Sequence, residues 1–529
     1  MFRTCQFITA RNSRFVYRQL HKIQRHEDNK TKYVNVQIDY VNEMIERNKI
    51  ASVDWSEFKK DVLSKPGILN ENNINAVLLK TLISSEKIDP AISFATYLKK
   101  NMKDLNLGSI IGILRLYFVL GTRNKLTKED KMFILDTYKF LYDKYKVLES
   151  KTCDSLLHAL CVIGEWKLAI KVLEDTYHTS TPTHSAFSTL IVTLFRENKK
   201  KEALKMVQRS IDNGRPLQDN AYDEWIKYVF RKYKDKKTIA KYLDEIIVHL
   251  KDNCITINEE VSKKIEHSYE CLEWRAKVTR IGRLHGQCLC CKEKLDSLKL
   301  SKEEFNLLQN NVKQKLIVGT DLFLKTSPQE LRRFQDFINE TAPFDIVLDA
   351  LNIAYASKTV TANKRIFFLN SVVDYFLEKD KKVLLLGRKH MLKWSKHTMS
   401  HLMKKTNCFF TEDISQDDPY LITAAIVSGP DTGFVSKDIL RGHKFKLDDV
   451  RLRQIFQRWQ WEHQWMVFSG RQGGVMVKEP ISFTPCAQKK GPNWHIPFEK
   501  DEVASKSLND GIPDLNTWLC IQPPENQNE

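Results

Sequence analysis

The first half of the chain carries hydrophobic residues at the spacing of amphipathic helices. Between residues 70 and 268 apolar side chains recur every three or four positions, and few segments alternate as a strand would. Two stretches within this region align when one is shifted by 34 residues. The pairs that coincide are Leu156 with Leu190, Leu160 with Leu194, Ala169 with Ala203 and Ile170 with Leu204. Each two-helix unit exposes an apolar face that a neighbouring unit must cover, so the pattern predicts a stacked helical array.

From Pro343 onwards the pattern changes to short apolar runs separated by amphipathic segments. Continuous apolar runs of this length are typical of strands that are buried on both faces of a sheet. The predicted strands end at Asp349, Gly387, Thr411 and Asp438, and the predicted helices cover 364–382, 396–407 and 417–429. Alternating strands and helices predict an α/β domain with a parallel sheet and helices on both faces.

Four acidic residues fall near the expected carboxyl ends of these strands. Asp349 ends the first strand, Asp438 ends the fourth, and Asp417 and Asp418 begin the helix after the third. Ligands of such sheets bind at this edge, so we expect the carboxylates to converge. Two carboxylates about 4 Å apart repel by about 4 kcal/mol at an effective dielectric of about 20. Mg²⁺ or Mn²⁺ would relieve the repulsion, and such an ion assists phosphodiester hydrolysis.

Three of the four acids also have a purely structural interpretation. Asp418 precedes Pro419 and has the sequence of a helix N-cap. Asp349 could cap the turn after its strand, and Asp438 could pair with a neighbouring basic residue. The metal-site hypothesis therefore rests on the acids as a group.

A second candidate site begins with two cysteines. Cys288 and Cys291 have C-x-x-C spacing before a polar turn, which usually supplies two ligands of a tetrahedral zinc site. No second C-x-x-C follows, so the other ligands must come from a distance. The candidates in the tail are Cys486, His495 and Cys520. If two of them complete the site, the α/β domain is an insertion in a zinc-stapled module, and zinc could contribute on the order of 10 kcal/mol of folding free energy. A redox role is the alternative, and Cys290 is interpreted as a bystander.

Composition and charge favour a polyanionic partner. Lys and Arg number 84 against 66 Asp and Glu, which gives a formal net charge of +18. Basic side chains near the acidic edge that could neutralise phosphates are Arg388, Lys389, Arg451 and Arg458. No run of about eighteen apolar residues occurs, so a membrane span is not expected. The length of 529 residues predicts three or four domains.

The N-terminal residues 1–26 contain Arg and Lys but no acid, with apolar residues interspersed. This pattern is typical of a mitochondrial transit peptide, so we expect a protein of the mitochondrial matrix. A basic RNA-binding arm is the alternative. The eleven cysteines are scattered along the chain and do not form the dense framework of a secreted domain.

The repeat region resembles a pentatricopeptide repeat array, whose helical units bind single-stranded RNA. It lacks the Trp and Gly-Tyr pattern of tetratricopeptide repeats. Periodicity alone also allows an ordinary helical solenoid that binds protein.

From about residue 70 to 525 the chain resembles protein-only ribonuclease P, most closely the mitochondrial enzymes of animals. The motifs that carry the resemblance are "FDIVLDALNIAY", "QDDPYLITAAI", "GFVSKDILRGHKF", "RWQWEHQW", "WHIPF" and "WLC". The resemblance implies a pentatricopeptide-repeat domain, a small zinc-binding central domain and a PIN-like metallonuclease domain. It also implies Mg²⁺-dependent hydrolysis at the 5′ end of precursor tRNA, which leaves a 5′-phosphate on the tRNA. The partners it implies are a tRNA methyltransferase subunit and a short-chain dehydrogenase subunit.

Carried over motif by motif, the resemblance assigns roles to particular residues. The metal-binding carboxylates become Asp349, Asp417, Asp418 and Asp438, and His443 matches a histidine close to the active site. The implied zinc ligands are Cys288, Cys291, His495 and Cys520, without Cys486. Ala350 stands where the family commonly has glycine, and Gly442 stands where an acid is common. Neither departure removes a metal ligand.

The expected domain organisation follows from these patterns. It comprises a transit peptide at 1–26, a helical extension at 27–69, an RNA-binding repeat domain at 70–268, a split zinc-binding domain at 269–340 with 480–529, and a metallonuclease domain at 341–479. The favoured function is an endoribonuclease that removes 5′ leaders from mitochondrial precursor tRNAs. The alternatives are an RNA-binding adaptor that does not cut, and a solenoid that scaffolds a protein complex.

Overall fold

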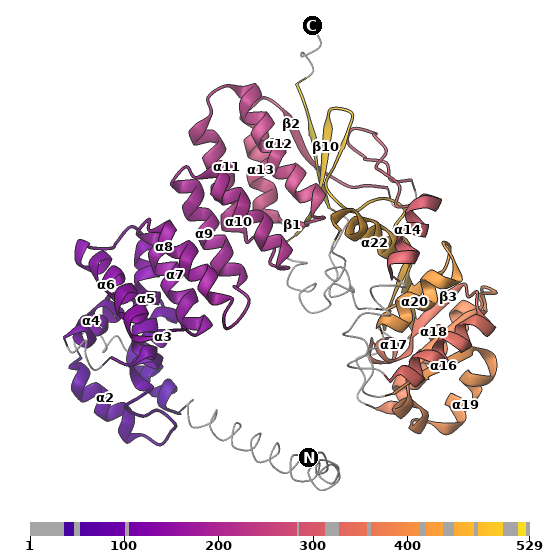
Figure 1. The fold of residues 1–529 in the computed structure, drawn as a ribbon, viewed down its shortest axis with the longest axis horizontal. Helices are drawn as coiled ribbons and strands as arrows, with labels where there is room; N and C mark the ends of the chain where they lie inside the picture. Colours follow the sequence, from indigo (N-terminus) through magenta and orange to yellow (C-terminus); the bar gives the residue numbers. More distant parts are fainter. Residues whose placement is uncertain are drawn as a thin grey trace, which may run out of the picture. The chain divides into compact units, whose positions relative to one another are not determined.

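The computed structural model forms two compact units, which comprise residues 1–224 and 225–529 (Figure 1). The structure describes residues 36–46, 53–100, 105–282, 285–312, 327–356, 361–412, 418–436, 449–469, 474–500 and 517–524. The expected transit peptide lies outside these ranges. Within them, no helix combines the length and apolar character needed to cross a membrane.

The first unit is built from consecutive helices joined by short turns. Its helices are α2 (Trp55–Ser64), α3 (Ile74–Ser84), α4 (Ile88–Lys99), α5 (Leu107–Thr122), α6 (Lys128–Lys144), α7 (Ser150–Val162), α8 (Trp166–Thr176), α9 (His184–Arg196) and α10 (Lys200–Asp212). Helix α11 (Asp219–Lys232) spans the limit between the units, and the second unit continues with α12 (Lys236–Asp252) and α13 (Glu259–Glu270).

The structure confirms the helical repeat. Helices α7 and α9 have the same length of 13 residues, and both their first and their last residues are 34 positions apart. The aligned side chains of Leu156, Leu190, Leu160 and Leu194 are all buried. The turn inside each of four successive units also contains one residue with positive φ, and these residues are Glu86, Asn124, Gly164 and Asn198. A recurring turn of this kind reverses the chain after each first helix, so the second helix packs back against it.

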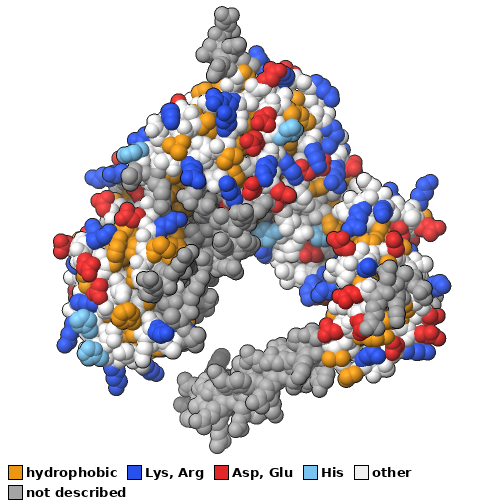
Figure 2. Space-filling view, turned by 180° about the vertical axis from the view of Figure 1, so that it is seen from behind, with side chains coloured by type: hydrophobic (Ala, Val, Ile, Leu, Met, Phe, Trp, Pro, Cys, Tyr) orange, Lys and Arg blue, Asp and Glu red, His pale blue; other side chains and the backbone are white. Residues whose placement is uncertain are grey.

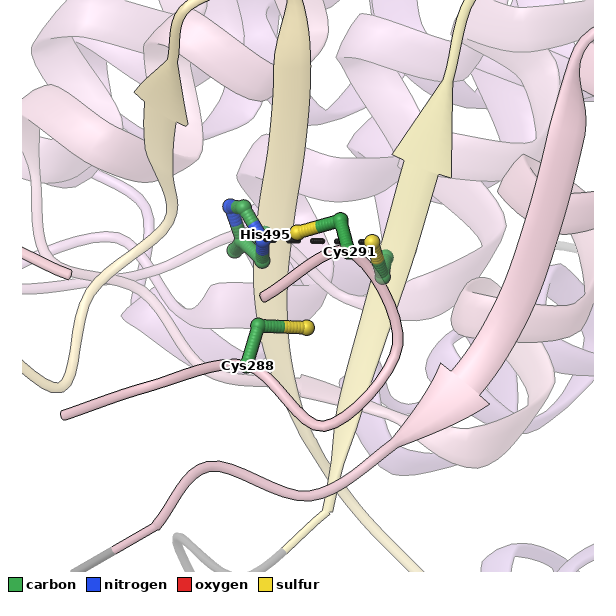
Figure 3. Close-up of side chains that lie close together, drawn as sticks. Cys288, Cys291 and His495 are labelled. Atoms are coloured by element: carbon green, nitrogen blue, oxygen red, sulfur yellow. Dashed lines mark hydrogen bonds between the residues drawn. The ribbon is translucent and has the colours of Figure 1, made fainter. Parts of the chain in front are cut away.

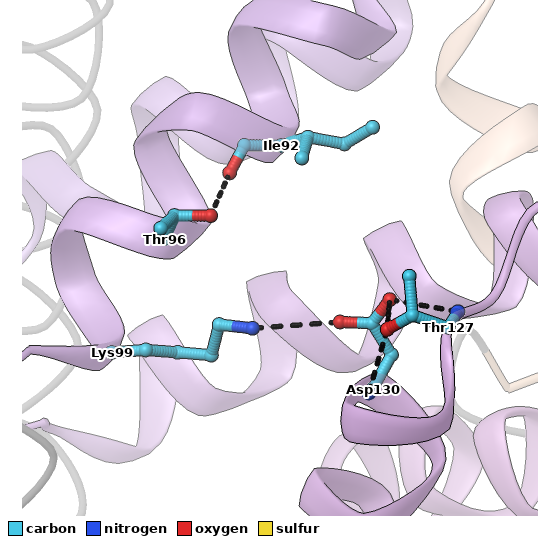
Figure 4. A network of polar contacts seen from close by, with 5 residues as sticks. All are labelled: Ile92, Thr96, Lys99, Thr127 and Asp130. Carbon is cyan, nitrogen blue, oxygen red and sulfur yellow. Dashed lines mark hydrogen bonds and ion pairs between the residues drawn. The ribbon is translucent and has the colours of Figure 1, made fainter.

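Polar contacts link neighbouring repeats as well (Figure 4). Thr127 and Asp130 form a reciprocal capping box at the start of α6. Lys99, in the last turn of α4, places its Nζ 3.4 Å from a carboxylate oxygen of Asp130. Asp130 therefore takes part in the N-terminal cap of α6 and also binds α4 of the preceding unit.

The second unit contains a five-stranded sheet made from two distant parts of the chain. Its strands are β1 (Ile257–Asn258), β2 (Arg275–Thr279), β9 (Gln488–Lys490), β10 (Asn493–Glu499) and β11 (Trp518–Gln522). The order is β1-β10-β11-β2, and β9 pairs with β10. Strands β10 and β2, which come from widely separated parts of the sequence, consequently belong to one sheet (Figure 1).

A six-stranded sheet in the order β5-β4-β3-β6-β7-β8 forms the α/β part of the same unit. The strands are β3 (Ile346–Asp349), β4 (Val383–Arg388), β5 (Asn407–Thr411), β6 (Gly433–Val435), β7 (Gln464–Ser469) and β8 (Val475–Lys478). The first five are parallel, and β8 pairs with β7 in the antiparallel sense. The predicted parallel sheet is confirmed, whereas β7 and β8 were not predicted.

Helices cover both faces of this sheet. They are α14 (Lys302–Val312), α16 (Pro328–Thr341), α17 (Ala350–Ala356), α18 (Ala362–Leu377), the 3₁₀ helix η4 (Lys389–Lys393), α19 (Lys396–Lys405), α20 (Asp418–Ser428) and α22 (Val450–His463). Alternate residues of β3 face opposite layers: Val347 packs with α14, α16, α20 and α22, while Ile346 and Leu348 pack with α17, α18 and α19.

Helices α14 and α16 end at or before residue 341, where the α/β domain was predicted to begin, and yet they pack in the core of that domain. Phe305 of α14 and Phe334 of α16 are buried in the same core as Val347 of β3. Their apolar faces complete one layer of the α/β sandwich, so the polypeptide enters this core about forty residues earlier than its first strand.

Candidate functional site

Asp349 is the last residue of β3, the strand at which the strand order of the sheet reverses. The chain adds β4 and β5 on one side of β3 and then returns to place β6 on its other side. Asp349 is 7% exposed, and it immediately precedes α17. Open α/β sheets bind ligands outside the carboxyl ends of their strands at such a switch point. The fold therefore puts a buried carboxylate at the position expected for a ligand site.

The Asp349 carboxylate accepts hydrogen bonds from the backbone and from a side chain. Its Oδ1 accepts a hydrogen bond from the backbone N–H of Asn352 at 3.0 Å, and its Oδ2 accepts one from the Ser436 hydroxyl at 3.3 Å. The first contact caps α17, as the structural interpretation of this residue suggested. The second comes from the residue that follows β6. A carboxylate offers about four lone-pair sites, so it can accept hydrogen bonds and bind a cation at the same time.

Of the other three predicted acids, only Asp418 lies within the described residues. Asp418 is the first residue of α20, is half-buried, and lies on a helix that packs against β3. Asp417, Asp438 and His443 lie outside the described residues. Ser436 follows β6 and is the last described residue before this gap. It donates a hydrogen bond to Asp349 and precedes Asp438 by two positions in the sequence.

Glu330 supports this edge and was not singled out from the sequence. It lies in the first turn of α16, is buried, and accepts a hydrogen bond from the backbone N–H of Glu412 at 2.8 Å. Glu412 follows β5 and also pairs with Lys389. Nothing in the local sequence distinguishes Glu330 from the exposed acids of the same helix, because its partner is 82 positions away.

Some of the basic residues expected to meet phosphates have internal partners. Arg458 pairs with Glu304 at 2.8 Å and donates to the carbonyl oxygen of Lys299, so it ties α22 to the segment around α14. Lys389 pairs with Glu412. Arg451 is exposed. Over the visible face, Lys and Arg side chains are spread among Asp and Glu (Figure 2).

Cys288, Cys291, His495 and Cys520 come together in the five-stranded sheet, and we call this group the Cys/His cluster. Their ligand atoms all lie within 4.8 Å of one another. Nε2 of His495 is 3.1 Å from Sγ of Cys291 and 3.8 Å from Sγ of Cys520 (Figure 3). Sulfurs bound tetrahedrally at about 2.3 Å from a zinc ion are about 3.8 Å apart. The donor set and its spacing thus fit a structural metal site.

Strand pairing explains why these two distant residues complete the group. His495 of β10 and Cys520 of β11 are direct partners in the antiparallel ladder. Cys288 and Cys291 lie on a tight turn that includes Lys292 with φ of 65°. Cys290 is outside the cluster and contacts Gln522, and Cys486 is buried elsewhere. The cluster coincides with the four residues that the resemblance implies.

The thiols of the cluster have strongly perturbed acidities. A hydrogen bond from Cys520, and a further one with His495, lower the pKa of Cys288 to about 3. The same bond to Cys288 raises the pKa of Cys520 well above its usual range. Burial raises the pKa of Cys291. One thiolate is therefore stabilised by its neighbours, and a metal that binds all three sulfurs must displace the remaining thiol protons.

These features together define a class: a helical repeat array joined to an α/β domain with a buried carboxylate at its switch point and to a Cys/His cluster that could hold a metal. Residues 283–520 match the protein-only RNase P family. The mitochondrial ribonuclease P catalytic subunits of Mus musculus and Rattus norvegicus are each 30% identical to the chain, over 482 and 485 residues, and each match covers 89% of this chain and 78% of the relative. The chain belongs to the protein-only ribonuclease P family.

Among solved structures, nuclear proteinaceous RNase P 2 from A. thaliana matches 86% of this chain and 99% of its own length. The TM-score is 0.49 and the sequence identity is 15%.

Proposed function

We propose that this chain is the catalytic subunit of a mitochondrial ribonuclease P, an endoribonuclease that removes 5′ leaders from precursor tRNAs. The observation that carries the proposal is the buried carboxylate of Asp349 at the switch point of the sheet, in a chain of the protein-only ribonuclease P family. A buried carboxylate at a strand end is costly unless it binds hydrogen-bond donors or a cation, and a divalent cation would stabilise its charge.

The catalytic ion is proposed to be Mg²⁺, or Mn²⁺ in its place. Its ligands would be Asp349, Asp417, Asp418 and Asp438, because carboxylate oxygens are the ligands that these ions prefer. When bound, such an ion supplies charge stabilisation for the phosphoryl group and lowers the pKa of water. Hydrolysis on the leader side of the phosphate would leave the 5′-phosphate on the tRNA.

The chain's own groups prepare this edge in two ways. The Ser436 hydroxyl and the Asn352 N–H fix the orientation of the Asp349 carboxylate before any ion or RNA binds. Packing of α20 against β3 brings Asp418 to the same edge. Such preorganisation reduces the reorganisation needed when the scissile phosphate arrives. His443 is proposed to lie nearby, within the segment after β6.

The Cys/His cluster is proposed to bind structural Zn²⁺. The cluster offers four protein donors, which is the number that a closed structural zinc site uses, whereas a catalytic site usually has three. The ion would link the turn at Cys288 to the C-terminal strands β10 and β11, and so hold together the halves of the split domain.

The proposed setting is the mitochondrial matrix, and the proposed substrate is mitochondrial precursor tRNA gripped by the pentatricopeptide repeats. A tRNA methyltransferase subunit and a short-chain dehydrogenase subunit are the proposed partners. The mouse and rat relatives are catalytic subunits of mitochondrial ribonuclease P.

The direct test is cleavage of a mitochondrial precursor tRNA by the purified chain with Mg²⁺, with and without the two partners. Wild type is compared with Asp418→Asn, which keeps nearly the same side-chain shape but loses a carboxylate. Cleavage at the mature 5′ end that the substitution abolishes supports the nuclease. If both proteins bind the RNA and neither cuts it with the partners present, the chain is an adaptor instead.

A further inference from the structure

An exposed aromatic side chain lies on the helix that starts at the candidate active site. Tyr355, in α17, is 53% exposed. The guanidinium carbon of Arg365, in α18, lies 4.0 Å from the centre of its ring. A tyrosine of this exposure leaves ring surface open, and the guanidinium provides both a planar face and a positive charge.

The position of the pair relative to Asp349 follows from helix geometry. Tyr355 is three residues after Asn352, whose N–H binds the Asp349 carboxylate, so the two residues lie on one side of α17. The Cα of Tyr355 is about 9 Å further along the helix axis than that of Asp349. Since helical side chains tilt towards the N-terminus of their helix, the ring lies nearer to Asp349 than its Cα does.

Arg365 belongs to the same edge of the sheet. Helix α18 connects the parallel strands β3 and β4, so it begins near the carboxyl ends of the strands and runs back towards their amino ends. Arg365 is in the first turn of this helix. The pair is thus next to the edge where Asp349 and Asp418 lie, and it is not needed for the metal site.

We propose that Tyr355 and Arg365 form a stacking subsite for the unpaired base of the leader nucleotide next to the scissile phosphate. This inference rests on the proposed function, because it requires an RNA cleaved at Asp349. The base on the tRNA side of the cut is held in the acceptor stem by pairing and by stacking on the next base pair, whereas leader bases are single-stranded. Unpaired bases stack on aromatic rings and guanidinium planes with little regard to sequence. The Arg365 charge meets the adjoining phosphate.

A second tyrosine–cation pair offers a matched control. Lys379 lies 4.4 Å from the ring centre of Tyr375, at the other end of α18. By the same topology this pair is at the amino edge of the sheet, away from Asp349. Tyr375→Ala therefore removes a similar contact without touching the proposed subsite.

The test uses a precursor tRNA with 2-aminopurine at the last leader position, bound without added Mg²⁺ to the full chain under the partner condition that supports cleavage. Stacking quenches this fluorophore, so we expect quenching with wild type, Tyr355→Phe and Tyr375→Ala. Quenching should be lost with Tyr355→Ala and reduced with Arg365→Ala. Thermal melting verifies that each variant is folded, and Tyr355 is exposed enough that its replacement should be tolerated.

Cleavage kinetics then separate the subsite from a general effect. Tyr355→Ala should lower kcat/KM about tenfold on a normal precursor and have no further effect on one with an abasic last leader position. An abasic position should cost wild type a similar factor. Equal quenching by wild type and Tyr355→Ala, or losses that multiply, would overturn the subsite. If wild type itself does not cut at the mature 5′ end, the proposed function fails instead.

Discussion

At the residue scale, Asp349 shows how one carboxylate can serve both the fold and the site. One of its oxygens caps α17 and the other binds the Ser436 hydroxyl. These roles separate chemically, since an amide oxygen can still accept a hydrogen bond but does not carry the negative charge that a divalent cation needs.

Asp349→Asn should therefore abolish most activity while it leaves the fold intact. We expect kcat for leader removal to fall at least about hundredfold, because a metal ligand contributes several kcal/mol of charge stabilisation. The thermal midpoint should change little. The control is Asp345→Asn, at an exposed acid before the same strand that accepts a hydrogen bond from the Lys382 N–H. Equal loss of activity in both variants would argue that these substitutions act through the strand and not through a metal.

A half-buried histidine in the repeats gives the stability of the first unit a defined pH dependence. Burial lowers the pKa of His158 to about 4, and its ring stacks on Phe118 and contacts the Ser185 hydroxyl. In the unfolded chain this side chain takes up a proton near pH 6.5, so the unfolded state binds more protons between the two values. Stability from this group is complete above about pH 6.5 and is lost as the pH falls towards 4.

The expected loss is up to about 3 kcal/mol at pH 4, from a shift of about 2.5 pKa units. Urea unfolding between pH 7 and 4.5 should show a smaller decline for His158→Gln than for wild type. His178→Gln changes an exposed histidine in the same array and should behave as wild type does. Parallel declines in all three proteins would contradict the assignment.

At the scale of elements, the strands whose sequences are short apolar runs between polar segments could be predicted, whereas β7 and β8 could not. Val383–Gly387 reads as a buried strand, and it is found as β4 with one residue more. Strand β7 follows α22 directly at Gln464, with no Gly, Pro or Asn to mark the change. Helices α14 and α16 carry few apolar residues, so their burial depends on a sheet that forms later in the chain.

The end of β5 is held by a residue from a distant part of the sequence, Glu330 of α16. Glu330→Ala would remove the carboxylate that accepts the hydrogen bond of the partly buried Glu412 N–H at the end of β5. The loss of one hydrogen bond of this kind costs about 1 kcal/mol or somewhat more. We expect a lower thermal midpoint and a higher Mg²⁺ concentration for half-maximal cleavage.

The Mg²⁺ requirement distinguishes positioning from simple destabilisation. Glu340→Ala removes an exposed acid from the same helix and should alter neither quantity. If Glu330→Ala lowers the thermal midpoint but leaves the Mg²⁺ dependence unchanged well below that midpoint, Glu330 has only a structural role.

At the scale of the whole molecule, the ligand set and the strand pairing of the split domain were the hardest features to predict from the sequence. The C-x-x-C pair is a local signal, but the choice among Cys486, His495 and Cys520 depends on which strands pair. The structure brings in His495 and Cys520 because β10 and β11 place them opposite each other, and β11 then pairs with β2 more than two hundred residues earlier. A local sequence pattern cannot predict a pairing between strands that are so far apart in the chain.

The cluster predicts that adjacent cysteines differ sharply in their effect on metal content. Cys291→Ser removes a donor whose sulfur lies 3.1 Å from His495 Nε2, whereas Cys290→Ser changes a neighbour outside the cluster. Elemental analysis should find about one zinc per chain in wild type and Cys290→Ser, and much less in Cys291→Ser. Because zinc would link the turn at Cys288 to strands that return after the α/β insertion, its loss should lower the thermal midpoint and also reduce cleavage, although Asp349 is untouched. Equal zinc content in the two variants would show that Cys291 is not required for zinc binding.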